Sequence, residues 1–199
     1  MKKISVLFFL LCFLFSYSQT DEFQKADEQY NKRMSSFLKK NPEKTTARLQ
    51  QERIILEEKL VSYRSTLEKI RVEEQKLVTE VPAPSVPPVS KKPEFELGES
   101  KFKELLTSAY KDNIASLHYT QNVVYSAKLS CAVDSKGYVY DVKVKGKNAD
   151  INTFILAAFY QIKDKGKWKP AEVNGHPILY VFSYPVTIIF DQKESDSNE

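Results

Sequence analysis

Five of the nine prolines in the chain fall between residues 81 and 93, and this cluster constrains the fold more than any other feature. Proline fixes φ and lacks a backbone N–H, so it interrupts helices and the interior of sheets. We therefore expect an extended, polyproline-like linker over residues 81–94; a proline-rich ligand for another domain is the alternative. The linker divides the 199 residues into a helical part, residues 19–80, and a carboxy-terminal domain, residues 95–191, followed by a disordered tail at 192–199.

Residues 1–18 have the three-part layout of a secretory signal peptide. A basic start and an apolar run over residues 4–15 lead to Ser16 and Ser18, which suit cleavage before Gln19. That run is too short for a membrane-spanning helix, which needs about 20 residues. The sequence therefore predicts cleavage and a location in the periplasm. An inner-membrane anchor is the alternative, and membrane contact is expected only if the leader is retained.

The helical part is predicted to contain two helices. Apolar residues recur every three or four positions over residues 21–40, which is the spacing of one helical face. Asn41 and Pro42 suit the N-cap and the first position of a second helix, which is expected to continue to Thr79. Its apolar residues form a heptad seam that is interrupted at Glu74. The seam residues are Leu56, Leu60, Tyr63, Leu67, Ile70 and Leu77.

An apolar seam must be covered by something, and the sequence leaves three arrangements open. The first helix can fold back on the second as a hairpin, residues 21–79 can self-associate as a coiled coil, or the second helix can remain solvated. Ile54 and Ile55 widen the apolar face and favour the hairpin. A continuous helix over residues 43–79 would be roughly 55 Å long, which is typical of a spacer or an interaction surface.

The carboxy-terminal domain is predicted to be α+β, with a small antiparallel sheet and two helices. The expected order is a helix over 99–117, strands over 125–133 and 138–145, a second helix capped by Asp150, and a last strand over 178–190. Three apolar residues of the second strand, Tyr140, Val142 and Val144, are expected on one face, and Lys143, Lys145 and Lys147 on the other. Cys131 falls on the apolar side of the first strand, so we expect a buried thiol.

This domain resembles the TonB carboxy-terminal domain. The resemblance is carried by the run Asp-Ser-Lys-Gly-Tyr-Val-Tyr-Asp-Val-Lys-Val from Asp134 to Val144, by a later Trp-Lys-Pro-Ala and Asn-Gly, and by the long last strand. It covers about Glu99 to Phe190, and the order of leader, proline-rich spacer and terminal domain is also that of the family. The motif residues are Gly137, Trp168, Lys169, Pro170, Ala171, Asn174 and Gly175.

The resemblance implies a periplasmic module that binds an extended segment of an outer-membrane transporter and serves transmembrane transport. Binding would occur by β-strand addition, in which a sheet edge offers unpaired backbone groups to an incoming strand. In the family the last strand is that edge, and the vacant N–H position of Pro185 is expected to face outward. The residues implied to bind the partner are Leu179, Val181, Ser183, Pro185, Thr187 and Ile189.

Other chemistries have little support in the sequence. The net charge of +4 is too low for a nucleic-acid-binding domain. His118, His176 and two cysteines are too few for a metal site, and we expect no cofactor. No phosphate loop or catalytic set stands out, so no enzyme is predicted. Trp168 is expected to be a packing residue.

Two further functions remain open. The chain can be an envelope scaffold that self-associates through its helices and whose terminal domain pairs with itself or with an envelope protein rather than a transporter. It can also be an energy transducer, provided that the leader is retained as an anchor. The family transducers keep a membrane-spanning amino terminus and lack the heptad helix, and the chain departs from them in both respects.

Overall fold

The computed structural model describes residues 22–77, 88–117 and 123–190. The predicted leader, the tail, His118 and the first half of the linker, residues 81–87, lie outside these ranges. Within them, no helix is both long enough and apolar enough to cross a membrane.

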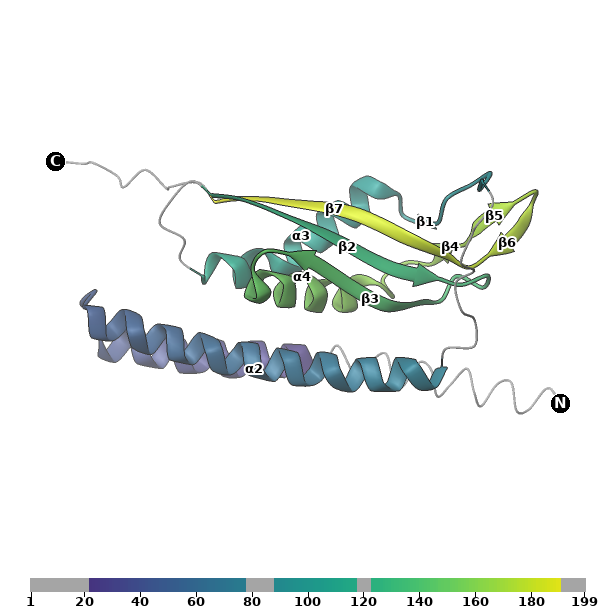
Figure 1. Cartoon of the computed structure of the whole chain (residues 1–199). Helices are drawn as coiled ribbons and strands as arrows, with labels where there is room; N and C mark the ends of the chain where they lie inside the picture. The colour runs from purple at the N-terminus through teal and green to yellow at the C-terminus, as the bar shows by residue number, and fades with distance from the viewer. Residues whose placement is uncertain (1–21, 78–87, 118–122, 191–199) are drawn as a thin grey trace.

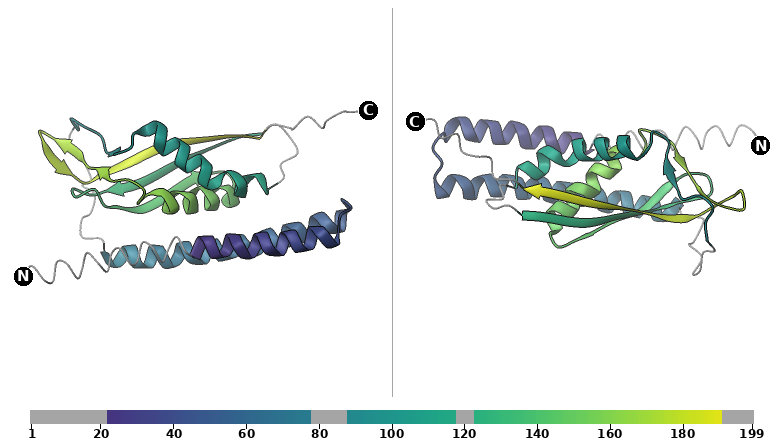
Figure 2. Two further views of the ribbon diagram at one scale, coloured as in Figure 1. Left: turned by 180° about the vertical axis from the view of Figure 1, so that it is seen from behind. Right: turned by 90° about the horizontal axis from the view of Figure 1, so that it is seen from above.

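The described residues form three layers, with a sheet above two helices and a helical hairpin below them (Figures 1 and 2). The sheet is antiparallel in the order β3-β2-β7, and α3 and α4 cover one of its faces. The α+β class is therefore confirmed. The elements are α3 (Glu99–Ala115), β2 (Val123–Val133), β3 (Val139–Gly146), α4 (Ala149–Ile162) and β7 (Tyr180–Phe190).

Two small antiparallel pairs lie at one end of this sheet (Figure 1). The strand β1 (Glu94–Phe95) pairs with β4 (Trp168–Lys169), and β5 (Ala171–Val173) pairs with β6 (His176–Ile178). The end of the predicted linker is paired as well, because the backbones of Lys91 and Glu172 form a bridge. The segment that precedes β1 is therefore attached to β5.

A bulge in β3 changes which face its first residues occupy. The register pairs Ser130 with Lys143 but Ala132 with Tyr140, so one extra residue lies in β3, at Asp141 or Val142. Asp141 has a positive φ of 52°, a conformation that aspartate tolerates better than most residues. Since Ala132 lies on the helix-free face, Tyr140 lies there too. The prediction that Tyr140 shares a face with Val142 and Val144 was wrong, because the bulge breaks the two-residue alternation.

The amino-terminal residues form a hairpin, one of the three arrangements that the sequence leaves open. It is made of a helix over residues 22–40 and α2 (Thr46–Leu77) (Figure 2). The expected start of α2 at Asn41 and Pro42 was wrong. The Asn41 side chain instead donates to the carbonyl of Phe37 at the end of the first helix. The Thr45 hydroxyl accepts from the Arg48 N–H and so caps α2.

The seam of α2 is covered from two sides. The first helix contributes Phe23 and Ala26, and α4 contributes Phe154. They are buried in one core with the seam residues Leu56, Leu60, Tyr63 and Ile70, and Leu67 is partly buried against it. The aromatic ring of Tyr63 lies edge-on to Phe23 at 5.0 Å and to Phe154 at 5.7 Å. Ile55 is buried, whereas Ile54 faces solvent. The hairpin is therefore not an isolated rod, because α4 lies against one of its faces.

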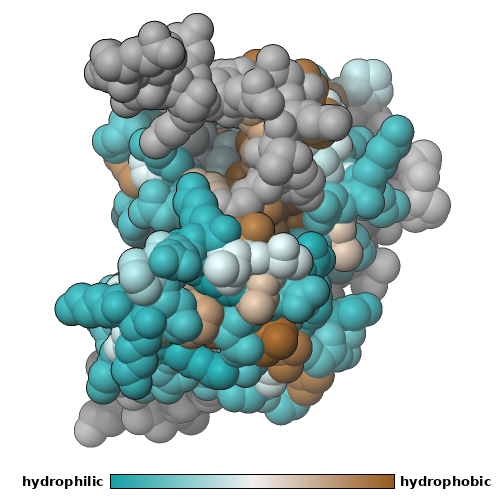
Figure 3. Space-filling model, turned by 90° about the vertical axis from the view of Figure 1, so that its left-hand side faces the viewer, coloured by the Kyte–Doolittle hydropathy of each residue, from teal (hydrophilic) through white to brown (hydrophobic). Residues whose placement is uncertain are grey.

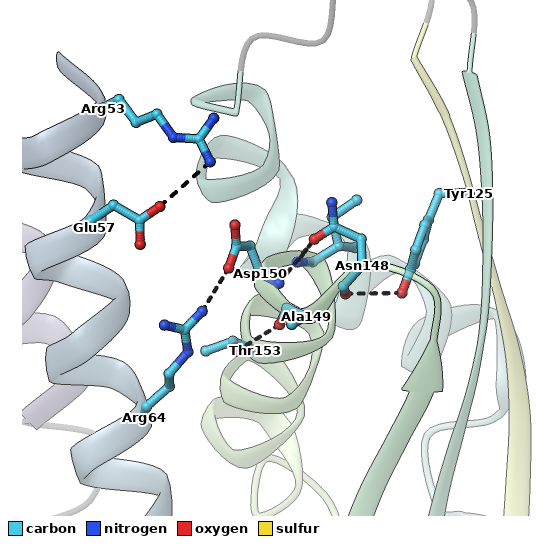
Figure 4. A network of polar contacts seen from close by, with 9 residues as sticks. Arg53, Glu57, Arg64, Tyr125, Asn148, Ala149, Asp150 and Thr153 are labelled. Carbon is cyan, nitrogen blue, oxygen red and sulfur yellow. Dashed lines mark hydrogen bonds and ion pairs between the residues drawn. The ribbon is translucent and has the colours of Figure 1, made fainter. Parts of the chain in front are cut away.

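The α4 helix is apolar on almost all sides, because it packs between the sheet and α2. The predicted cap at Asp150 was wrong by two residues: the Asn148 side chain accepts from the N–H groups of Asp150 and Ile151. Asp150 is left in the first turn, where its carboxylate accepts from Arg64 of α2 at 2.6 Å (Figure 4). An acidic residue at a helix start is favourable, and here it also ties α2 to α4.

Glu74 explains the gap in the heptad seam. Its Oε2 atom accepts a hydrogen bond from the Tyr160 hydroxyl at 3.0 Å and another from the Asp141 N–H at 3.1 Å. A leucine at this position would leave both donors without this acceptor. Burial raises the pKa of the Glu74 carboxyl, and the Tyr160 hydrogen bond and the charge of Lys163 oppose that change in part. The break in the seam is therefore an attachment point of α2 to α4 and β3.

We expect the contribution of Glu74 to stability to depend on pH. Because its pKa is raised in the folded state, this contribution is complete below the usual carboxyl range and is lost as the pH rises through the raised pKa. Glu74→Gln keeps an acceptor oxygen and carries no charge, so it should flatten the pH dependence. Glu74→Ala should lower the free energy of unfolding by about 1–3 kcal/mol, because two donors lose their acceptor.

Urea unfolding of the three proteins between about pH 4 and pH 8 measures this difference. Glu73→Gln is a suitable control, since Glu73 pairs only with Lys76 on the helix surface in the described contacts. A Glu74→Gln profile parallel to that of the wild type would contradict the prediction.

Candidate functional site

The candidate site is the outer edge of β7. This strand lies at one end of the sheet order and pairs with β2 alone, and no other strand within residues 22–77, 88–117 and 123–190 pairs with it. Its ladder with β2 runs without a register shift from Val123–Phe190 to Val133–Tyr180. An edge of 11 residues is long, and its unpaired N–H and C=O groups can accept a further strand.

The position of Pro185 shows which backbone groups face outward. Pro185 lies opposite Lys128. Opposite residues in an antiparallel pair either exchange two hydrogen bonds or point their backbone groups away from each other. Proline has no N–H, so this pair is of the second kind, and the nitrogen and carbonyl of Pro185 face the open edge. By the alternation of the strand, the backbone groups of Val181, Ser183, Thr187 and Ile189 face it as well.

The side chains of the same residues lie on the helix-free face of the sheet. All five are exposed, with 46% of Val181 and 62% of Ile189 accessible to solvent. The alternate residues Phe182, Tyr184 and Val186 pack against the core on the helix side. Leu179 lies between β6 and β7, outside the strand, so it is not part of this edge. A partner strand would therefore meet the other five implied residues and miss Leu179.

The two edges of the sheet differ in charge. β7 contains no charged residue. The opposite edge strand, β3, carries exposed Lys143 and Lys145 and contains the bulge near Asp141. Lysines and bulges are the usual means by which proteins prevent edge strands from pairing. Of the two edges, only that of β7 lacks both of these protections.

Hydrophobic exposure alone does not define the site. Seen from the end of the molecule where β7 finishes, the described surface is mainly hydrophilic, with small separate hydrophobic areas (Figure 3). Val124 and Ile189 lie opposite each other and are both exposed at this end of the ladder. Backbone pairing, rather than a broad apolar patch, is the recognition chemistry that this edge offers.

The motif residues of the resemblance gather at the other end of the sheet. Gly137 has a φ of 85°, and a Cβ atom on it would lie 2.2 Å from the Trp168 carbonyl oxygen. Trp168 is buried, and its indole N–H donates to the Lys163 carbonyl, which confirms its packing role. Asn174 and Gly175 form the β5–β6 turn with positive φ angles of 50° and 79°. These residues shape the fold and do not line the middle of the β7 edge.

Lys169, Pro170 and Ala171 continue this segment between β4 and β5. Cys131 is buried, as predicted, and burial raises the pKa of its thiol. Among the described residues there is no cluster of three or more metal-binding side chains.

Sequence reasoning missed Lys128 and the bulge in β3. Lys128 lies between Pro185 and Lys145 in the ladder and is exposed with them on the helix-free face. Lys128 alternates with the buried residues of β2, but only the register shows that it lies beside Pro185. The one local sign of the bulge was an aspartate, Asp141, in the middle of a strand of apolar and basic residues.

Comparison with known protein families, curated proteins and solved structures finds no match to this chain. The TonB resemblance therefore remains an expectation drawn from the residues quoted above.

Proposed function

We propose that this protein binds an extended segment of a partner protein, which adds as a further strand to the open edge of β7. The observation that carries this proposal is the contrast between the two edges. β3 has lysines and a bulge, whereas β7 offers 11 residues without a charge. An edge of this length that has no charge and no bulge, and whose strand contains a single proline, is an aggregation hazard unless it has a function.

Strand addition needs backbone donors and acceptors at regular spacing, and the edge supplies them. Val181 and Ser183 present N–H and C=O groups on one side of Pro185, and Thr187 and Ile189 present them on the other. The flanking side chains are aliphatic or carry hydroxyl groups, so they suit an uncharged strand.

The partner that we propose is an outer-membrane transporter. Binding would take place in the periplasm and would serve transmembrane transport. This part rests on the resemblance to the TonB carboxy-terminal domain and on the predicted signal peptide. The leader lies outside the described residues, so both cleavage and the retained-anchor alternative stay predictions.

A scaffold that self-associates through residues 21–79 receives no specific support. The seam that would mediate such a contact is occupied by the first helix and by α4. Self-association through this segment therefore stays a prediction.

Thr187→Pro tests the proposal because it removes an outward N–H without removing a bond to β2. Pro185 already shows that the strand accommodates proline at an outward position. We expect the purified chain to capture a transporter from detergent-solubilised outer membranes, and Thr187→Pro to abolish that capture. Thr187→Val keeps the N–H and is the matched control, which should bind as the wild type does.

The captured protein should be identified by mass spectrometry, and a synthetic peptide from its extended segment should compete for binding. Equal capture by the wild type and Thr187→Pro would overturn the proposal.

A further inference from the structure

The centre of the β7 edge holds the one backbone position that cannot donate a hydrogen bond. Pro185 lies at the middle of the outward positions, with Val181 and Ser183 before it and Thr187 and Ile189 after it. Its ring occupies the place where an N–H would point at an incoming strand. Proline on an edge strand is a known protection against unwanted pairing, so its central place has a consequence for the choice of partner.

One unwanted partner is β7 of a second copy of the chain, because it carries the same open edge. Two identical edges can pair antiparallel about a two-fold axis, which gives a self-complementary contact. The longest such pairing places residue 185 on the axis, Ser183 opposite Thr187, and Val181 opposite Ile189 of the copy. Without Pro185, nothing in β7 would oppose this contact, because the strand has no charge to repel its copy.

With Pro185 present, both copies lack an N–H donor at the centre of that contact. Both rings meet at the axis, and two hydrogen bonds are lost in the same pair. Registers that avoid the ring engage only one end of the strand. A different chain brings no second ring and can place a bulge or a turn opposite Pro185.

We infer that Pro185 prevents β7 from pairing with a second copy and restricts the edge to an uncharged, extended segment of a different protein. The part on the different protein rests on the proposed function, whereas the part on self-pairing does not. The side chains of the segment that lie beside Val181, Ser183, Thr187 and Ile189 should be uncharged, because these four neighbours carry no charge.

Pro185→Val tests the inference, since it restores the N–H and adds a residue that favours strands. Two regained hydrogen bonds and the removal of two rings should strengthen self-association of the purified chain by at least about tenfold. Sedimentation velocity over a range of concentrations measures this change. The double variant Pro185→Val/Thr187→Pro returns a ring to the neighbouring outward position and should restore the behaviour of the wild type.

An unchanged sedimentation profile for Pro185→Val would overturn the inference, and so would self-association of the wild type that Thr187→Pro removes. Circular dichroism of each variant separates ordered self-pairing from aggregation of misfolded chains. If Pro185→Val self-associates as expected but the wild type captures no transporter, the proposed function fails while the role of Pro185 in self-pairing stands.

Discussion

Replacing Tyr63 by alanine is expected to lower the free energy of unfolding by about 3–5 kcal/mol, the usual cost of truncating a buried aromatic side chain. Tyr63 is completely buried, and it joins three helices besides its own. Its ring packs edge-on against Phe23 of the first helix and Phe154 of α4. Its hydroxyl donates to Asp27 at 2.6 Å and accepts from Asn113 of α3 at 3.3 Å.

Tyr63→Phe is the matched control, because it keeps the ring and removes the hydroxyl. Burial raises the pKa of Tyr63, so the hydroxyl stays protonated and remains a donor at ordinary pH. Asp27 keeps a partner in Lys59 at 2.7 Å, so the loss should be only about 1 kcal/mol. Urea unfolding followed by circular dichroism measures both variants. A cost for Tyr63→Ala no greater than that for Tyr63→Phe would show that the hairpin does not pack on α4 as described.

Val186→Pro is expected to destabilise the protein by about 2–6 kcal/mol. Val186 is buried and lies opposite Ala127, and the alternation of β7 directs its N–H toward β2. Proline there leaves an unsatisfied carbonyl, at about 1–3 kcal/mol. Its ring would also enter packed surroundings, which lowers the free energy of unfolding by about 1–3 kcal/mol more.

Thr187→Pro provides the comparison one residue along the chain. Its outward N–H has no described partner strand, so the change in stability should stay within about 1 kcal/mol. Thermal and urea unfolding of both variants would test the orientation of the backbone groups on which the candidate site depends. Equal destabilisation by the two prolines would show that β7 is not oriented as its pairing with β2 requires.

Features that depend on nearby residues were predictable from the sequence. The alternation from Tyr125 to Val133 predicted β2, and the buried side of that strand contains Cys131, as expected. The Asn174–Gly175 pair is of the kind that favours a tight turn, because both residue types tolerate positive φ, and the structure has a turn there. The heptad seam predicted a helix whose apolar side must be covered.

Local competition limited the accuracy at helix ends. Asn148 and Asp150 are both good capping residues two positions apart, and the sequence does not rank them. In the structure Asn148 caps α4, and Asp150 pairs with Arg64 of α2, which is a contact between residues far apart in the chain. The start of α2 was also predicted wrongly. The Asn41 side chain donates to the Phe37 carbonyl at the end of the first helix and does not cap α2.

The sequence by itself determined the periods of helix and strand, the turns and the break at the linker, because each depends on φ/ψ preferences and on side chains a few residues apart. Only the tertiary structure decided that α4 covers the seam of α2, that Glu74 fills its gap, and that β7 ends the sheet with Pro185 turned outward. These features depend on which strands and helices become neighbours. Pairing and packing join residues far apart in the chain, so no local pattern records them.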